Sequence, residues 1–466
     1  MPPLLALSIW FVLLVLLLRF DPAKDPEASW TLWIPVIWMS IGASRLPSQW
    51  FGVGAGTIAS ALEEGNPLDR AIYLMLLVIS VAILLARPID WGALITRNLA
   101  VTAYVSFAFL SILWSDFAYV SFKRWCRDLG SYLLILIVLS APRPYEAVRT
   151  VLRHLCYLLI PLSIILIKYF DIGTVYDEWS GLASYVGVTT SKNMLGVLCL
   201  FGGIFVFWDI VRLWADRTSP RIKRIIFVDF GFILMTLYLL RLAHSATSAV
   251  CFAIGCMVIA VAHSKWGRVH PSFIKGVIPA AFFLYLILGF GLGLNAFFAE
   301  MLGRDPTLTD RTRIWSALLS MDTNPLVGTG YESFWLGSRL DAVFAKSGVH
   351  INEAHNGYLE MYLNMGLIGL VLLVCVLVTT YRNIIRQPLD SVGSFTSLTC
   401  SLWVTALFYN VTEASFKHGL MWLGLLLGAI TIPTQHNDEA TSFAMIDDNV
   451  STGEVLAWES GPDRDS

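Results

Sequence analysis

Charged residues are scarce in this sequence. Only 14% of its 466 residues are charged, whereas 56% are hydrophobic, and the mean hydropathy is +0.67. Soluble domains usually contain about 25% charged residues, so the composition lies far outside the range of soluble proteins. The sequence therefore predicts an integral membrane protein.

The seven cysteines lack the spacing of a metal site. They form no CxxC pair, and no combination with histidine suits zinc. Each lies in or beside an apolar run, which favours a role as a small packing residue. The cysteines are Cys126, Cys156, Cys199, Cys251, Cys256, Cys375 and Cys400.

The first apolar run, residues 3–20, lacks both features of a removable signal peptide. No basic residue precedes it, and no small-residue cleavage site follows it. We therefore expect this run to be retained as a membrane helix.

Apolar runs close to the roughly 20 residues that cross a bilayer recur along the chain. About thirteen are present, so the expected fold class is an all-α polytopic membrane protein with about 12–13 transmembrane helices. The runs are 3–20, 30–46, 67–86, 97–114, 129–141, 151–170, 193–214, 225–242, 246–262, 273–294, 357–380, 395–411 and 416–432.

The basic linkers predict the orientation. Cytoplasmic linkers carry an excess of Lys and Arg, and the richest linkers are 141–154, 215–224, 263–275 and 381–388. If the helices alternate, all four lie on one side, which we assign to the cytoplasm. The N-terminus is then outside and the C-terminus inside. The external polar segments are 47–66, 115–128, 171–192, 243–247 and 295–356.

Four regions follow from this topology. Residues 1–294 are expected to form an N-terminal transmembrane bundle of about ten helices, and residues 295–356 one large external loop domain. Residues 357–432 supply the C-terminal transmembrane helices. The tail, 433–466, contains eight acidic residues and one Arg, so we expect it to be disordered in the cytoplasm.

A polar stripe opens the run after the large external loop. In AHNGYLEMYLNMGLIG, Asn356, Glu360 and Asn364 are spaced by four and share one helix face. Polar groups at this depth seldom face lipid, so we expect them to line a cavity open to the outside. His355 lies at its lip, although a lone histidine at a helix start is commonly a capping or interfacial residue. Gly366 should allow close helix packing.

Basic residues gather on the same external side. The loop GRDPTLTDRTRIW contributes Arg304, Arg311 and Arg313, and NPLVGTGYESFW follows with turn glycines and an aromatic pair suited to membrane or sugar surfaces. Four more basic residues are Lys192, Arg241, Arg124 and Arg127. Arg binds phosphate oxygens in a fork, which indicates a phosphorylated ligand. Arg124 and Arg127 have an alternative interpretation as bases that reach lipid phosphates.

These motifs carry a family resemblance. GRDPTLTDRTRIW, NPLVGTGYESFW and AHNGYLEMYLNMGLIG resemble, in this order, the loop and helix of the O-antigen ligase and Wzy-type polymerase superfamily, especially its exopolysaccharide-production branch. SRLPSQW, GNPLDR and TSKNMLG extend the resemblance over most of the chain. It implies a GT-C-like glycosyltransferase that uses an undecaprenyl-diphosphate-linked glycan outside the bacterial cytoplasmic (inner) membrane.

The resemblance also assigns residues by motif. Arg311 matches the arginine of the family element TLTGRT, although Asp310 replaces its usual glycine. His355 matches the histidine of the HN element, and Lys192 the lysine of the KN element. The usual Ser-Arg-Thr reads His-Ser-Ala-Thr at 244–247, so its arginine is missing and Arg241 lies about one turn earlier.

The residue types suit transfer from a diphosphate. Arg and Lys can neutralise the leaving diphosphate, so no metal and no cofactor are expected. The external loops also lack an acidic pair spaced for Mg²⁺ or Mn²⁺. His355, with an ordinary pKa near 6.5, is expected to accept the proton of the acceptor hydroxyl, oriented by Glu360. Inversion at the anomeric carbon is implied by the resemblance alone.

Three functions compete at this stage. The exopolysaccharide branch favours a polymerase that joins lipid-linked repeats, and the alternative is an O-antigen ligase that transfers the glycan to lipid A core or another acceptor. A flippase for the same lipid-linked sugar is disfavoured, because no internal repeat is visible. Expected partners are the lipid-linked donor, the acceptor, membrane lipids, a chain-length regulator and export proteins, with no nucleic acid.

Overall fold

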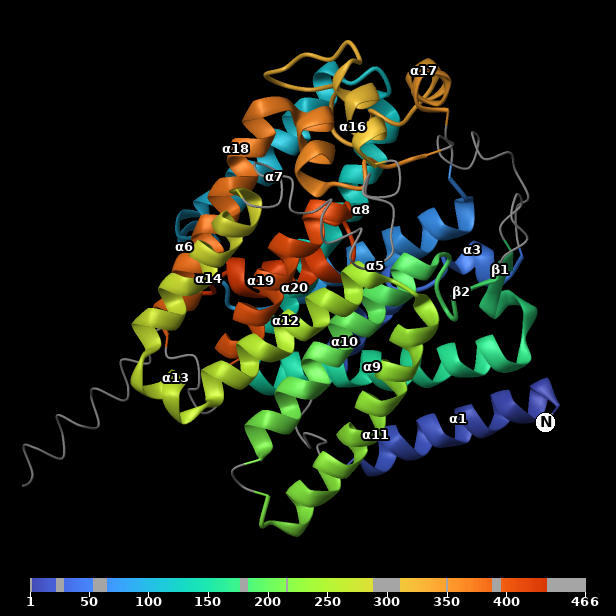
Figure 1. The fold of residues 1–466 in the computed structure, drawn as a ribbon, viewed down its shortest axis with the longest axis vertical. Coiled ribbons are helices and arrows are strands. Elements are labelled where there is room, and N and C mark those ends of the chain that lie inside the picture. The colour runs from blue at the N-terminus through green and yellow to red at the C-terminus, as the bar shows by residue number, and fades with distance from the viewer. Residues whose placement is uncertain are drawn as a thin grey trace, which may run out of the picture.

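The structure, a computed structural model, is built almost entirely of α-helices (Figure 1). It describes residues 2–21, 29–52, 65–176, 183–214, 217–287, 311–348, 351–387 and 395–433. The described strands, β1 (Thr174–Tyr176) and β2 (Ala183–Tyr185), form one antiparallel hairpin with Thr174 opposite Tyr185.

The helices follow one another along the whole described chain. In the first half they are α1 (Pro3–Phe20), η1 (Trp30–Leu32), α2 (Trp33–Gly42), α3 (Pro47–Trp50), α5 (Pro67–Leu85), α6 (Trp91–Arg97), α7 (Leu99–Leu110), η2 (Ser111–Trp114), α8 (Ala118–Leu139), α9 (Pro144–Tyr169), η3 (Asp171–Gly173) and α10 (Lys192–Leu213). In the second half they are α11 (Pro220–Ala243), α12 (Ala246–His263), α13 (Lys265–Val269), α14 (Pro271–Leu286), α16 (Arg311–Leu319), α17 (Ser338–Ser347), α18 (Gly357–Ile385), α19 (Thr396–Thr412) and α20 (Leu420–Ala429).

Each predicted apolar run overlaps a helix within the described residues, which confirms the all-α polytopic fold class. Within the described residues, seven helices are long and apolar enough to cross a membrane, or eight if the bent pair from Trp91 to Trp114 is one span. The number is below the predicted 12–13 because several runs form short helices. For example, α2 and α20 have 10 residues each, and the first half of α8 is charged.

α10 lies at the centre of the bundle. Its side chains Phe201, Phe205 and Trp208 are buried, and α9, α11, α12 and α19 pack around it. At Gly203, an added Cβ would approach Phe252 of α12 and Thr236 of α11 closely, so the missing side chain allows both helices near. Four of the five predicted packing cysteines in these helices are buried thiols, namely Cys156, Cys199, Cys251 and Cys400.

The basic linkers gather at one end of the bundle, which we call the basic end. Asn383 Nδ2 of α18 donates to the carbonyl of Ala429 in α20 at 3.0 Å. His263 of α12 hydrogen-bonds Ser397 at the start of α19 at 3.1 Å. These contacts place the end of α18 beside the end of α20, and the end of α12 beside the start of α19, as the alternating topology requires.

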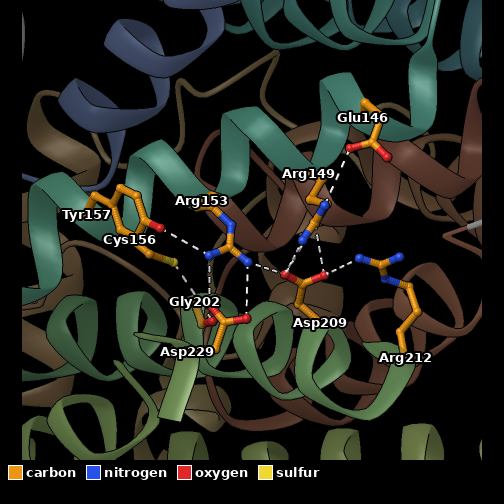
Figure 2. Close-up of polar contacts among 9 residues, drawn as sticks. All are labelled: Glu146, Arg149, Arg153, Cys156, Tyr157, Gly202, Asp209, Arg212 and Asp229. Carbon is orange, nitrogen blue, oxygen red and sulfur yellow. Dashed lines mark hydrogen bonds and ion pairs between the residues drawn. The ribbon is translucent and has the colours of Figure 1, made fainter. Parts of the chain in front are cut away.

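A buried ionic network also joins three helices toward this end (Figure 2). Arg153 of α9 binds Asp229 of α11 at 2.8 Å and also pairs with Asp209 of α10. Asp209 accepts further bonds from Arg149 at 3.0 Å and Arg212 at 2.7 Å. Removing one partner of such a network typically costs about 3–5 kcal/mol, because a buried charge is left unpaired. The network therefore fixes how α9, α10 and α11 pack.

The described residues between 311 and 354 form a small folded layer at the opposite end, at the top of Figure 1, which we call the loop layer. Its core contains Ile314, Leu318, Val343, Phe334 and Trp335. The aromatic pair was predicted to pack on a membrane or on sugar rings, and the structure corrects this. Phe334 is 0% exposed and Trp335 5% exposed, because both fill the interior of this layer.

Candidate functional site

The start of α18 is held in place by the loop before it. α18 is interrupted at Gly366, whose φ of 64° is open to glycine. There the amide of Leu367 donates to the carbonyl of Pro325 at 2.9 Å, and the amide of Gly330 donates to the carbonyl of Asn364 at 2.9 Å. An added Cβ at Gly366 would overlap the backbone of Leu326. The missing side chain of Gly366 thus lets the loop that contains Pro325 and Leu326 pack against α18, whereas we predicted that a neighbouring helix would pack there.

Glu413, just after α19, is the centre of a polar cluster at this end. Its carboxylate is 6% exposed and accepts from Arg311 Nη2 at 2.8 Å. Asn193 Nδ2, in the first turn of α10, donates to it at 3.2 Å, and His355 Nδ1 lies 3.3 Å away. The structure thus brings together Arg311 and His355, which were predicted as site residues, on a carboxylate that was not.

Glu353 completes the surroundings of His355. Its carboxylate lies 3.1 Å from His355 Nδ1, so two carboxylates face one ring nitrogen. Burial opposes protonation of the ring, but the hydrogen bonds to Glu353 and Glu413 outweigh it and raise the pKa of His355 to about 9. The pKa of His355 thus lies above the ordinary histidine value of about 6.5. At neutral pH the imidazolium and the Arg311 guanidinium balance the two carboxylates.

The backbone is strained at two residues near the Glu413 cluster. Glu332 and His355 have φ values of 52° and 48°, in the left-handed region that non-glycine residues adopt rarely. Such strain costs of order 1–3 kcal/mol per residue and gathers at functional sites. At His355 it turns the chain so that the imidazole meets Glu413 just before α18 begins.

Glu360 does not contact His355 in the way we predicted. Its carboxylate accepts from Trp335 Nε1 at 2.7 Å, from the amide of Ala354 at 2.9 Å and from Asn364 Nδ2 at 3.2 Å. These bonds fasten α18 to the loop layer. Glu413 and Glu353 replace Glu360 as the carboxylates that orient the histidine.

The polar stripe of α18 faces protein and a small cavity. Glu360 and Asn364 line a space of about 20 Å³ together with Glu332 and Lys417, enough for about one water molecule. Asn356 is not among the lining residues. Its Oδ1 caps α18 by accepting from the amides of Tyr358 and Leu359. The structure thus brings two of the three predicted residues, Glu360 and Asn364, to a cavity, whereas Asn356 serves as the N-cap of α18.

Lys417, between α19 and α20, is a cation that the sequence reasoning missed. Its Nζ lies 3.7 Å from Glu360. Burial disfavours its charge, but Glu332 and Glu360 outweigh this effect and raise its pKa. Arg124 also interacts with Lys417 electrostatically, so positive charge continues from the His355 cluster toward α8.

The two arginines of α8 hold protein groups. Arg124 Nη1 donates to the carbonyl of Glu332. Arg127 pairs with Asp128 at 2.9 Å and donates to His418 Nδ1 at 2.9 Å. These contacts join α8 to the loop layer and to the linker before α20, so both arginines belong to the framework of the site.

The remaining predicted bases lie at the edge or elsewhere. Lys192 is exposed at the first position of α10, directly before Asn193, whose side chain reaches Glu413. Arg241, at the end of α11, and Arg313, in α16, are also exposed, and the structure shows neither in the Glu413 cluster. Arg304 lies outside the described residues.

Glu413 and Lys417 had a signal in the sequence. NVTEASFKHG, residues 410–419, is a polar stretch where the run 395–411 ends and the run 416–432 begins, and alternation would place it on the external side. What the sequence could not show is that this short linker folds against His355, which is far away along the chain.

The cluster also has the donor set of a metal site. One ligand atom from each of Glu353, His355 and Glu413 lies within 4.8 Å of the others. A divalent ion there would displace the proton of Nδ1 and compete with Arg311 for Glu413. A metal-free site remains our expectation, and activity in chelator tests it.

The fold and this site define a multi-pass membrane protein with a polar cluster of Arg, His and carboxylates at one end. Residues 230–374, which contain Arg311, Glu353 and His355, match the family described as O-antigen ligase. A relative is the exopolysaccharide production protein ExoQ of Rhizobium meliloti (strain 1021), 29% identical over 312 residues, which are 62% of this chain and 65% of that protein. The chain is therefore similar to O-antigen ligases over this region and to an exopolysaccharide production protein over less than two thirds of that protein's length.

Proposed function

We propose that this protein is a glycosyltransferase that polymerises undecaprenyl-diphosphate-linked oligosaccharide repeats on the outer face of the cytoplasmic membrane. The observation that carries the proposal is the convergence of Arg311 and His355 on Glu413, within or next to the region that matches the O-antigen ligase family. The similarity to an exopolysaccharide production protein favours polymerase over ligase.

Arg311 is proposed to stabilise the leaving diphosphate. Its side chain is 15% exposed, so it is partly shielded from water yet reachable from the external side. One Nη is engaged by Glu413, which holds the guanidinium while its other N–H groups are available for phosphate oxygens. Lys192 and Lys417 supply further positive charge near the same end. As the bond from the anomeric carbon to the diphosphate breaks, these cations stabilise the charge on the leaving oxygens.

His355 is proposed to take the proton of the acceptor hydroxyl. With Nδ1–H donated to Glu413 or Glu353, the neutral ring presents Nε2 as the proton acceptor, and the carboxylates stabilise the imidazolium that forms. The attacking hydroxyl oxygen bonds to the anomeric carbon, the diphosphate leaves with the bonding electron pair, and the hydroxyl proton moves to Nε2. The high pKa of His355 makes it a strong base that must lose a proton before each turnover.

A gene deletion distinguishes polymerase from ligase. For a polymerase, the deletion strain should lose long secreted polysaccharide and retain intact lipopolysaccharide, with single lipid-linked repeats accumulating. Full-length polymer accumulating on the lipid carrier would favour the ligase. Loss of polymer with the single lipid-linked repeats trapped on the cytoplasmic side, instead of accumulating on the outer face, would favour a flippase. Complementation with His355→Ala separates a loss of chemistry from a loss of the protein.

A further inference from the structure

A large groove lies between α1 and α11 at the basic end, far from the Glu413 cluster. It has a volume of about 970 Å³ and is formed where the last residues of α1 meet the first turns of α11, near the bottom of Figure 1. The ion pair of Arg153 with Asp229, which joins α9 to α11 toward the basic end, follows these first turns of α11. The groove therefore lies at the basic end, together with the basic linkers.

The groove combines three cations with an apolar wall. Arg221, Lys223 and Arg224 of α11 line it, and Asp21 is the carboxylate among its lining residues. Phe20 of α1 and Phe227 of α11 line it as well, and their side chains are 72% and 80% exposed. Positive charge next to large exposed aromatic groups is the arrangement that a lipid headgroup and its acyl chains require.

α1 has few protein contacts to hold it in place. Of its residues, only Ala6 and Leu14 are buried, and it packs mainly against α9. Leu4, Phe11 and Phe20 are more than half exposed. The space between α1 and α11 is thus open, and protein side chains within the described residues do not fill it.

We propose that this groove binds an anionic glycerophospholipid, with its phosphate on Arg221, Lys223 and Arg224 and its acyl chains against Phe20 and Phe227. Charge complementarity favours an anionic headgroup, since the described lining residues include three bases and one carboxylate. The bound lipid fills the space between the helices and fastens α1 to α11. The proposal does not depend on the catalytic function.

The test compares two lipids and two triple variants. Delipidated protein in detergent is titrated with phosphatidylglycerol or with phosphatidylcholine of the same acyl chains, and bound lipid is counted by native mass spectrometry. Each interfacial base contributes roughly fivefold to binding of an anionic lipid surface, so R221Q/K223Q/R224Q should weaken phosphatidylglycerol binding by about 100-fold. The matched control, R97Q/R382Q/R386Q, removes three exposed charges near the same end and should retain the binding.

The outcomes separate this site from general attraction. The proposal is supported if the protein prefers phosphatidylglycerol and if the first triple variant loses this preference while the control variant retains it. Phosphatidylglycerol binding that persists in R221K/R224K also supports it. Three outcomes would overturn the proposal: equal binding of both lipids, equal loss of phosphatidylglycerol binding in both triple variants, or tighter binding of undecaprenyl phosphate than of phosphatidylglycerol. If the first triple variant does not fold, each single variant should still bind roughly fivefold more weakly, and unchanged binding in all three contradicts the site.

Discussion

Replacing Glu353 by Gln tests how the site controls the proton on His355. Glu353 and Glu413 lie 3.1 and 3.3 Å from the same Nδ1, and the pKa of His355 is about 9 instead of its ordinary 6.5. This difference corresponds to roughly 3 kcal/mol in favour of the protonated ring. Glutamine keeps the size of the side chain and a carbonyl acceptor but removes the charge, so the variant isolates the electrostatic contribution.

The direction of the effect follows from the role of the base. A base must be neutral to act, and at pH 7 a group of pKa 9 is neutral in only about 1% of molecules. The wild-type kcat/KM should therefore rise about tenfold per pH unit above pH 7 and level off near pH 9. If the two carboxylates contribute similarly, Glu353→Gln lowers this midpoint by about one pH unit and raises the relative rate at pH 7.

The assay is the initial rate of glycan transfer in proteoliposomes between pH 6 and 10. Asp341→Asn, which removes an exposed carboxylate of α17, is the matched control and should leave the midpoint unchanged. The reasoning fails if Glu353→Gln leaves the midpoint where it is. It also fails if the wild-type rate falls as the pH rises through 9, because His355 would then act in its protonated form.

Three further predictions concern charge, topology and metal. Arg311→Lys keeps the charge but loses the forked guanidinium, so glycan transfer should drop at least tenfold, which corresponds to about 1.4 kcal/mol. The control Arg382→Lys, at the basic end, should leave transfer unchanged. Near-normal transfer by Arg311→Lys contradicts the diphosphate role. Ser316→Cys and Ala345→Cys, both at exposed positions, should react with an impermeant thiol reagent in intact spheroplasts, and Gln387→Cys only after lysis; the reverse pattern would invert the orientation. Transfer should persist in EDTA, and activity lost in chelator and restored by a divalent ion would assign the Glu353, His355 and Glu413 cluster to metal binding.

The sequence predicted the parts of the fold that depend on local pattern. Apolar runs located the helices, and linker charge placed the segments 141–154 and 381–388 at one end, because hydrophobicity and charge act residue by residue. The number of long spans was less predictable. The bend between α6 and α7 and the break at Gly366 depend on tertiary contacts, since the loop that fills the break is folded against α18.

The candidate site was predictable in its motif residues and not in its partners. Arg311 and His355 stood out through charge and motif, whereas Glu413 was missed because it joins them only when the linker after α19 folds back. Glu360 illustrates the opposite error. Its spacing placed it correctly on one face with Asn364, but the spacing could not reveal that Trp335 and Ala354 already occupy its carboxylate.

The most direct test of the central claim is glycan transfer by His355→Ala in proteoliposomes, measured together with binding of the lipid-linked donor. The account predicts that transfer is abolished while donor binding survives, since the proton acceptor serves the chemistry and Arg311 holds the diphosphate. The protein should reach the membrane at normal levels, because the imidazole lies outside the packed apolar core and its side chain is 26% exposed. Transfer near the wild-type rate by His355→Ala would contradict the account.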